Sequence, residues 1–100
     1  MITKNYILLK LKELKPTLKR EFAVSEIGLF GSFSDGTFSE ESDIDLLVEF
    51  EENTQELYEL KLQIKDYFKT SLGLEVDICR EKYIKARIKS SILKETVYAD

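Results

Sequence analysis

The chain has 100 residues, of which 43% are hydrophobic and 34% are charged, and its formal net charge is −4. A chain of this length is expected to form a single domain over residues 1–100, with one hydrophobic core. It contains no His and a single Cys, Cys79. This composition excludes Ser-His and Cys-His catalysis, zinc sites built on His and Cys, and internal disulfides. Any bound metal must use carboxylate oxygens, which favours Mg²⁺, Mn²⁺ or Ca²⁺.

The sequence predicts a cytoplasmic protein without membrane contact. No apolar run approaches the roughly 18 residues that a transmembrane helix needs. The first residues also lack the charged and then apolar pattern of a secretory signal.

Hydrophobic spacing predicts the elements of the first half. Residues 3–14 are expected to form a helix, which Pro16 interrupts, and Pro16 is expected to start a second helical turn that ends near Phe22. Residues 24–30 are typical of a strand that ends at Gly31. Residues 34–42 are polar and indicate a loop that could hold one short helix.

The second half begins with a strong strand pattern over residues 43–50 and a turn over residues 51–54. A helix is expected over residues 55–71, with Gly73 as its C-terminal cap. Residues 74–78 alternate as a third strand, and residues 83–97 are predicted to form a final helix. The fold class is therefore α/β or α+β, with a small mixed sheet covered by helices.

Charge is distributed unevenly along the chain. Residues 1–20 carry six basic side chains and one acid, whereas residues 21–60 carry twelve acids and no Lys or Arg. Residues 61–100 carry nine basic and six acidic groups. Charge blocks are often solvated surfaces. The acidic block, however, contains the apolar run of a predicted core strand, and acids embedded in such a strand need a reason.

Three aspartates are candidates for chemistry. Asp43 and Asp45 lie two residues apart on the strand over 43–50, so both face the same side, about 6.6 Å apart at the backbone. Asp77 leaves the apolar face of the third strand in the same way. If the two strands are neighbours in register, three carboxylates converge, as a two-metal phosphoryl- or nucleotidyl-transfer site requires. The alternative is a set of acids on a solvent-exposed sheet face.

Gly31 and Ser32 follow the first strand directly. Gly allows a phosphate to approach the backbone, and Ser32 can offer its hydroxyl and its amide to an anion. Such a pair alone is weak evidence, because most Gly-Ser pairs are ordinary turns. It is not a Walker loop, since no Gly-Lys-Ser/Thr follows.

Taken together, these segments resemble a known family. Gly31-Ser32, ten further residues and Asp43-Ile44-Asp45 match the GSx10DxD signature of the polymerase-beta-like nucleotidyltransferase superfamily. Residues 27–30 and 46–50, the strand around Asp77 and the ending over residues 92–98 are similar to its minimal members. The resemblance covers nearly the whole chain and implies the polymerase-beta-like nucleotidyltransferase fold.

The resemblance implies that Asp43 and Asp45 hold Mg²⁺, with two ions expected. Asp77 would complete the site and help to activate the attacking hydroxyl. Gly31 and Ser32 would hold the triphosphate of the substrate ATP. Minimal members often act as antitoxins beside a helical ribonuclease toxin of the HEPN family, and some transfer AMP to a tyrosine of that toxin.

One departure from the family pattern favours an alternative. Many relatives carry an Arg shortly after Gly-Ser, where Asp35 stands here. The alternative function is therefore a non-catalytic antitoxin subunit that neutralises its toxin by contact. Cys79 is interpreted as a packing residue, since no His can activate it. The basic residues of the last predicted helix are interpreted as a solvated face, and with a pI near 5.0 no direct nucleic-acid binding is expected.

Overall fold

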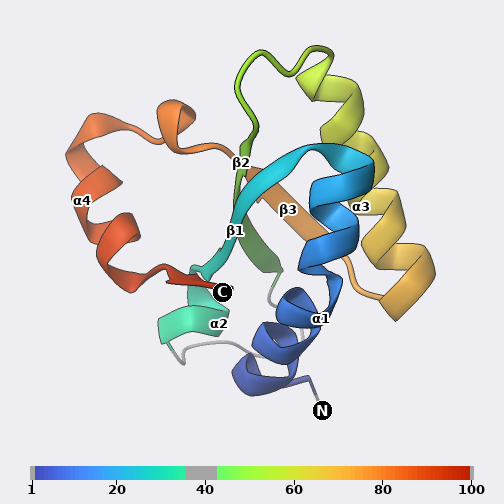
Figure 1. Ribbon diagram of the computed structural model, residues 1–100. Coiled ribbons are helices and arrows are strands. Elements are labelled where there is room, and N and C mark those ends of the chain that lie inside the picture. The colour runs from blue at the N-terminus through green and yellow to red at the C-terminus, as the bar shows by residue number, and fades with distance from the viewer. Residues whose placement is uncertain (1, 36–42, 100) are drawn as a thin grey trace.

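The computed structural model describes residues 2–35 and 43–99. Helices and strands alternate along this part of the chain (Figure 1). In chain order, the elements are α1 (Lys4–Phe22), β1 (Val24–Phe30), α2 (Ser32–Asp35), β2 (Ile44–Phe50), α3 (Leu57–Leu72), β3 (Val76–Cys79), the 3-10 turn η1 (Glu81–Tyr83), α4 (Ala86–Glu95) and β4 (Val97–Tyr98).

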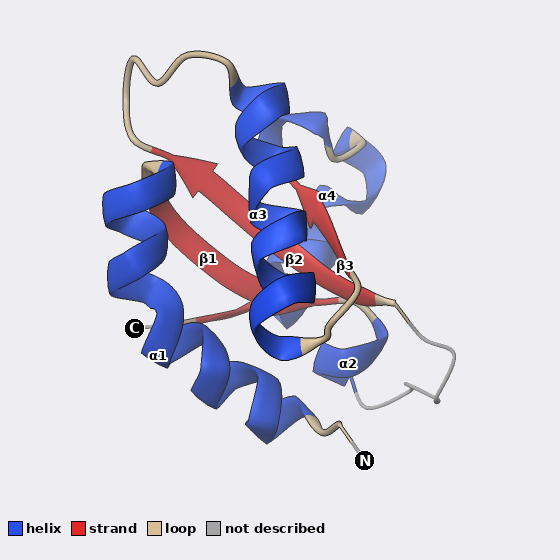
Figure 2. Cartoon of the chain, turned by 90° about the vertical axis from the view of Figure 1, so that its right-hand side faces the viewer, coloured by secondary structure: helices blue, strands red, loops and turns tan. Residues whose placement is uncertain are grey.

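The four strands form one mixed sheet in the order β3-β2-β1-β4. β1 pairs antiparallel with β2 and with β4, whereas β2 and β3 run parallel. Helices α1 and α3 cover one face of this sheet, and α4 lies on the other side (Figures 1 and 2). The expected α/β architecture, a small mixed sheet covered by helices, is confirmed.

Strand alternation separates a core face from a second face. Ile44, Leu46 and Val48 of β2 belong to the main core, together with apolar residues of α1 and α3. Asp45 and Glu49, which alternate with them, are half-buried on the opposite face. The predicted apolar face of this strand is therefore confirmed, and the same alternation is what directs Asp45 away from the core.

Helix α3 ends with the glycine cap that the sequence predicts. Gly73 adopts a left-handed conformation with φ of +66°. Its N–H donates to the carbonyl of Lys69, and the N–H of Leu74 donates to that of Phe68. These two bonds form the glycine-based cap that closes many helices.

Two predicted elements were wrong. α1 runs without interruption from Lys4 to Phe22 and contains Pro16 in its interior. Proline removes one backbone hydrogen bond, but Leu11 and Leu18 on either side of it are buried in the core and hold both halves of the helix in place. The final helix is shorter than residues 83–97, because η1 precedes it and residues 97–98 form β4, a strand that the sequence pattern did not indicate.

None of the helices in the described ranges combines the length and the apolar composition that crossing a bilayer demands.

Gly28 lies on β1 where β4 pairs with it, opposite Tyr98. A Cβ at this position would lie 2.8 Å from Cγ2 of Thr96 and 3.2 Å from the carbonyl oxygen of Val97. We predict that Gly28→Ala lowers the free energy of unfolding by about 1–3 kcal/mol, because the backbone of β4 must move to admit the methyl group. Urea denaturation measures this change.

Gly73→Ala is the matched control, because a Cβ there meets nothing within 4 Å and the cost comes from the positive φ alone. Both variants should be destabilised, but only Gly28→Ala should speed hydrogen exchange at Ala99, whose N–H donates to the carbonyl of Ile27 beside β4. Wild-type stability in Gly28→Ala would contradict the close packing of β4 against Gly28.

Candidate active site

Asp45 and Asp77 lie opposite each other on neighbouring parallel strands. They are paired in the register of β2 and β3, so their Cα atoms are about 4.8 Å apart. Asp45 is half-buried and Asp77 is exposed. Each sits between core residues of its own strand, so both carboxylates leave the sheet on the face away from α1 and α3. The condition for convergence, two neighbouring strands in register, is met.

Asp43 lies outside the paired part of β2 and β3. It precedes β2 by one residue and is exposed. Among the residues that the structure describes, no three acidic, Cys or His side chains already form a metal-binding group. The carboxylates are nevertheless of the type that hard divalent cations prefer. The chemistry of the donors therefore fits such a cation, although the described side chains do not form a finished cage.

Gly31, the first residue of the Gly-Ser pair in the sequence signature, lies next to Asp45. Because β1 and β2 are antiparallel, Phe30 is the register partner of Asp45, and Gly31 follows at once. Gly31 has a φ of +75°, and a Cβ there would overlap the carboxylate of Asp45. Glycine is thus required twice, by the backbone conformation and by the close approach of the acid. The Gly-Ser turn and the Asp-x-Asp strand are in contact.

The remaining parts of the predicted nucleotide site are described only in part. Ser32 begins the short helix α2 directly after Gly31, and the N–H of Ser34 donates to the carbonyl of Gly31 at 3.0 Å. The side chains of Ser32 and Asp35 lie outside what the structure describes, as do residues 36–42 of the predicted loop.

Glu95, the last residue of α4, is a site residue that sequence reasoning missed. The N–H of Gly31 donates to Oε1 of Glu95 at 3.1 Å, although the two residues are 64 positions apart. The hydroxyl of Ser34 donates to the backbone carbonyl of the same residue. The available signal was weak: Glu95 is the first acid after a basic segment over residues 82–94.

Carboxylates shape the electrostatics of this face. Burial raises the pKa of Asp45, and the negative charges of Asp77, Asp43 and Glu95 raise it further. No Lys or Arg in the described ranges forms an ion pair with any of the three aspartates. The carboxyl of Asp45 therefore lies among like charges that a bound cation would relieve.

Cys79 lies beside this acidic group but shows no sign of a nucleophile. The side chain is half-buried at the end of β3. Burial raises the pKa of its thiol, and the carboxylate of Asp45 adds to this effect. A raised pKa lowers the thiolate fraction at neutral pH, which agrees with the interpretation of Cys79 as a packing residue.

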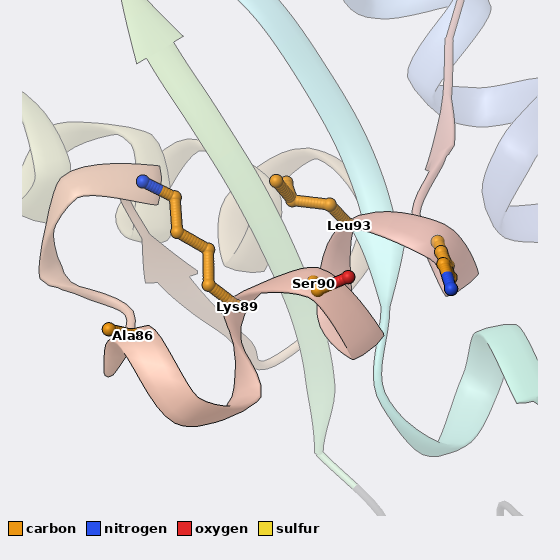
Figure 3. A pocket seen from close by; sticks show the side chains of 5 residues that line it. Ala86, Lys89, Ser90 and Leu93 are labelled. Carbon is orange, nitrogen blue, oxygen red and sulfur yellow. The ribbon is translucent and has the colours of Figure 1, made fainter.

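A shallow pocket runs along α4 and contains none of the aspartates. It is lined by Ala86, Lys89, Ser90, Leu93 and Lys94. Lys89 and Leu93, one helical turn apart, project from the same side of α4 (Figure 3). Lys89 forms an ion pair with Glu81 at 3.6 Å, and the C-terminal end of α4 reaches Gly31 through Glu95.

Comparison with known proteins agrees with this geometry. Residues 11–99 match the family described as the nucleotidyltransferase domain. The protein adenylyltransferase MntA of Thermococcus cleftensis is 40% identical over 84 residues, which cover 84% of this chain and 83% of that protein.

Solved structures share the fold. One, described provisionally as a minimal nucleotidyltransferase, matches with a TM-score of 0.75 and 28% identity over 96% of this chain and 95% of its own. A complex of the tri-AMPylated HEPN toxin of Shewanella oneidensis with an MNT antitoxin matches with a TM-score of 0.60, covering 93% of this chain and 71% of the other. Its 16% identity shows a common fold alone. The chain therefore belongs to the nucleotidyltransferase domain family and has the fold of the structure described as a minimal nucleotidyltransferase.

Proposed function

We propose that this protein transfers AMP from ATP to a hydroxyl group, that of a tyrosine, on a partner toxin of the HEPN family, and that it acts as the antitoxin of that pair. The observation that carries the proposal is the pairing of Asp45 with Asp77 across two parallel strands, with Gly31 in contact with Asp45. The names of similar proteins, an adenylyltransferase and an MNT antitoxin in complex with an AMPylated toxin, support the choice of reaction and partner. A cytoplasmic location stays a prediction.

The proposed reaction assigns a role to each residue. The acceptor oxygen attacks the α-phosphorus of ATP, a new P–O bond forms, and the bond to pyrophosphate breaks. Asp43, Asp45 and Asp77 would hold Mg²⁺, two ions in the full site, which would supply charge neutralisation at the reacting phosphate. The carboxylate of Asp77 would also accept the proton of the attacking hydroxyl. Gly31, whose own N–H donates to Glu95, would let the triphosphate approach the backbone closely, and Ser32 would bind it through its backbone N–H and its hydroxyl.

In this proposal the acceptor hydroxyl belongs to the partner and reaches the site from outside the chain. Asp77 is exposed on β3, near the strand end, so the acceptor hydroxyl can reach it from solvent. Neither a membrane nor a nucleic acid is part of the proposal.

A second candidate function is neutralisation by binding alone. It is favoured by the lack of Lys and Arg between residues 21 and 60, since Asp35 replaces a cation that could neutralise phosphate. The two functions differ in their need for ATP. A catalytic antitoxin inactivates the toxin only with Mg²⁺ and ATP and leaves AMP on it, which intact-mass spectrometry detects, whereas a binding antitoxin needs neither and leaves the mass of the toxin unchanged.

Substitution of Asp77 and of Asp45 should affect nucleotide binding and AMP transfer differently. We predict that Asp77→Asn loses transfer but still binds Mg²⁺-ATP, because it removes the proton acceptor on the side of the incoming hydroxyl. Asp45→Asn should lose both, because it removes a ligand shared by metal and nucleotide. Calorimetric titration with Mg²⁺-ATP measures binding. Intact-mass spectrometry of a HEPN protein encoded in the neighbouring open reading frame measures transfer.

Glu75→Gln is the control for these variants, because it removes an exposed acid that lies two residues before Asp77 and pairs with Lys69 in solvent. It should retain binding and transfer. Normal transfer by Asp77→Asn, or equal loss of nucleotide binding in both aspartate variants, would refute the assigned roles.

The raised pKa of Asp45 also predicts a dependence of stability on pH. The folded state favours the protonated form, so this stabilisation is fully present below the ordinary Asp pKa of about 3.9 and is lost as the pH rises through the raised value. In EDTA, Asp45→Asn should therefore melt above the wild type at pH 7, and the difference should vanish as the pH falls towards 4. Thermal melts at both pH values measure it.

Millimolar Mg²⁺-ATP should raise the melting temperature of the wild type and have less effect on Asp45→Asn, because a ligand stabilises only the state that binds it. Identical wild-type melting curves in EDTA and in Mg²⁺-ATP would count against a metal-nucleotide site.

A further inference from the structure

The turn that follows β1 is tied to the end of α4 at two points. The N–H of Gly31 donates to the side-chain carboxylate of Glu95 at 3.1 Å. Three residues later, the Ser34 hydroxyl donates to the backbone carbonyl of Glu95. Ser34 is buried, so this second contact is shielded from water. Glu95 thus contacts the turn on both sides of Ser32.

Glu95 adds a further negative charge near the aspartates. Its negative charge is one of the influences that raise the pKa of Asp45, which already faces Asp77 and Asp43. A fourth carboxylate near this group repels the others, and none of the ion pairs between described residues involves Glu95. Among the described residues, the Glu95 carboxylate accepts a hydrogen bond from the N–H of Gly31, and this bond offsets the repulsion.

The hydrogen bond fixes the peptide that matters most in the turn. Gly31 has a φ of +75° and lies against the carboxylate of Asp45, so a small rotation of its peptide would change the direction of the N–H groups that follow. The carbonyl of Gly31 is held as well, by the N–H of Ser34. Both the N–H and the carbonyl of Gly31 are therefore hydrogen-bonded, which restrains the turn.

We propose that Glu95 is a positioning residue, which holds the Gly31 turn in the orientation that binds the phosphates of ATP by accepting a hydrogen bond from Gly31. This inference rests on the proposed nucleotide site. It requires the reach and the acceptor oxygen of the side chain, and it does not require its negative charge.

Two substitutions separate reach from charge. Glu95→Gln keeps the length and an acceptor oxygen but removes the charge, whereas Glu95→Asp keeps the charge but is one methylene too short to reach Gly31. The dissociation constant of Mg²⁺-ATP is measured by calorimetry for each purified variant. We expect Glu95→Gln to bind within about twofold of the wild type, and Glu95→Asp to bind about five- to tenfold more weakly, as the loss of one hydrogen bond predicts.

Thr96→Val is the control for a general loosening of the same helix end. It removes the hydroxyl that donates to the carbonyl of Ile92 at 2.7 Å, keeps the shape of the side chain, and leaves Gly31 untouched. Its melting temperature should fall while its affinity for Mg²⁺-ATP stays at the wild-type value. Thermal melts of the Glu95 variants establish that each is folded at the temperature of the titration.

Each other outcome overturns the proposal. Weak binding by Glu95→Gln with normal binding by Glu95→Asp would mean that the charge acts, as in a metal ligand. Tighter binding by Glu95→Gln would mean that the carboxylate competes with phosphate for Gly31. Normal binding by both variants would mean that the turn needs no support from Glu95. Absence of Mg²⁺-ATP binding by the wild type would instead refute the proposed function itself.

Discussion

Repulsion between carboxylates is the constraint around which the second face of the sheet is built. Asp45 and Asp77 occupy paired positions of adjacent parallel strands, where a fold selected for stability alone would place apolar or oppositely charged side chains. No cation in the described part of the chain pairs with either. The proposed metal-nucleotide site would explain such an arrangement, because a bound cation relieves the repulsion.

The rest of the fold keeps these charges apart from the core. The same alternation that places Ile44, Leu46 and Val48 under α1 and α3 directs Asp45 to the opposite side, so the strand serves the core and the site at once. Buried core residues on α1, α3 and the three longer strands supply the hydrophobic stabilisation that offsets the repulsion. Core and candidate site therefore occupy opposite faces of one sheet.

Much of this could be predicted from the sequence, because alternation and capping are local. The strand faces and the cap at Gly73 depend on neighbouring residues only. The pairing of Asp45 with Asp77 could be stated only as a condition, since the register of two parallel strands depends on how the connecting helix α3 packs. The family resemblance supplied that missing information.

The errors have physical causes as well. Pro16 was predicted to break a helix, but burial of residues before and after it outweighs one lost hydrogen bond. β4 has two residues, too few to show any periodicity. The role of Glu95 arises from contacts with Gly31 and Ser34, which lie more than sixty positions away, and no local pattern reports such a contact.

The place of β4 beside β1 has a consequence for the order in which the protein matures. β1 is an inner strand whose partner on one side comes from the middle of the sequence and whose partner on the other side comes from residues 97–98. Most of the hydrophobic core lies on α1, β1, β2, α3 and β3, whereas Glu95 and β4 follow them in the chain. Contacts between distant residues form slowly, because the intervening loop must close first. We therefore expect the Gly31 turn to gain its support from Glu95 after the core has collapsed.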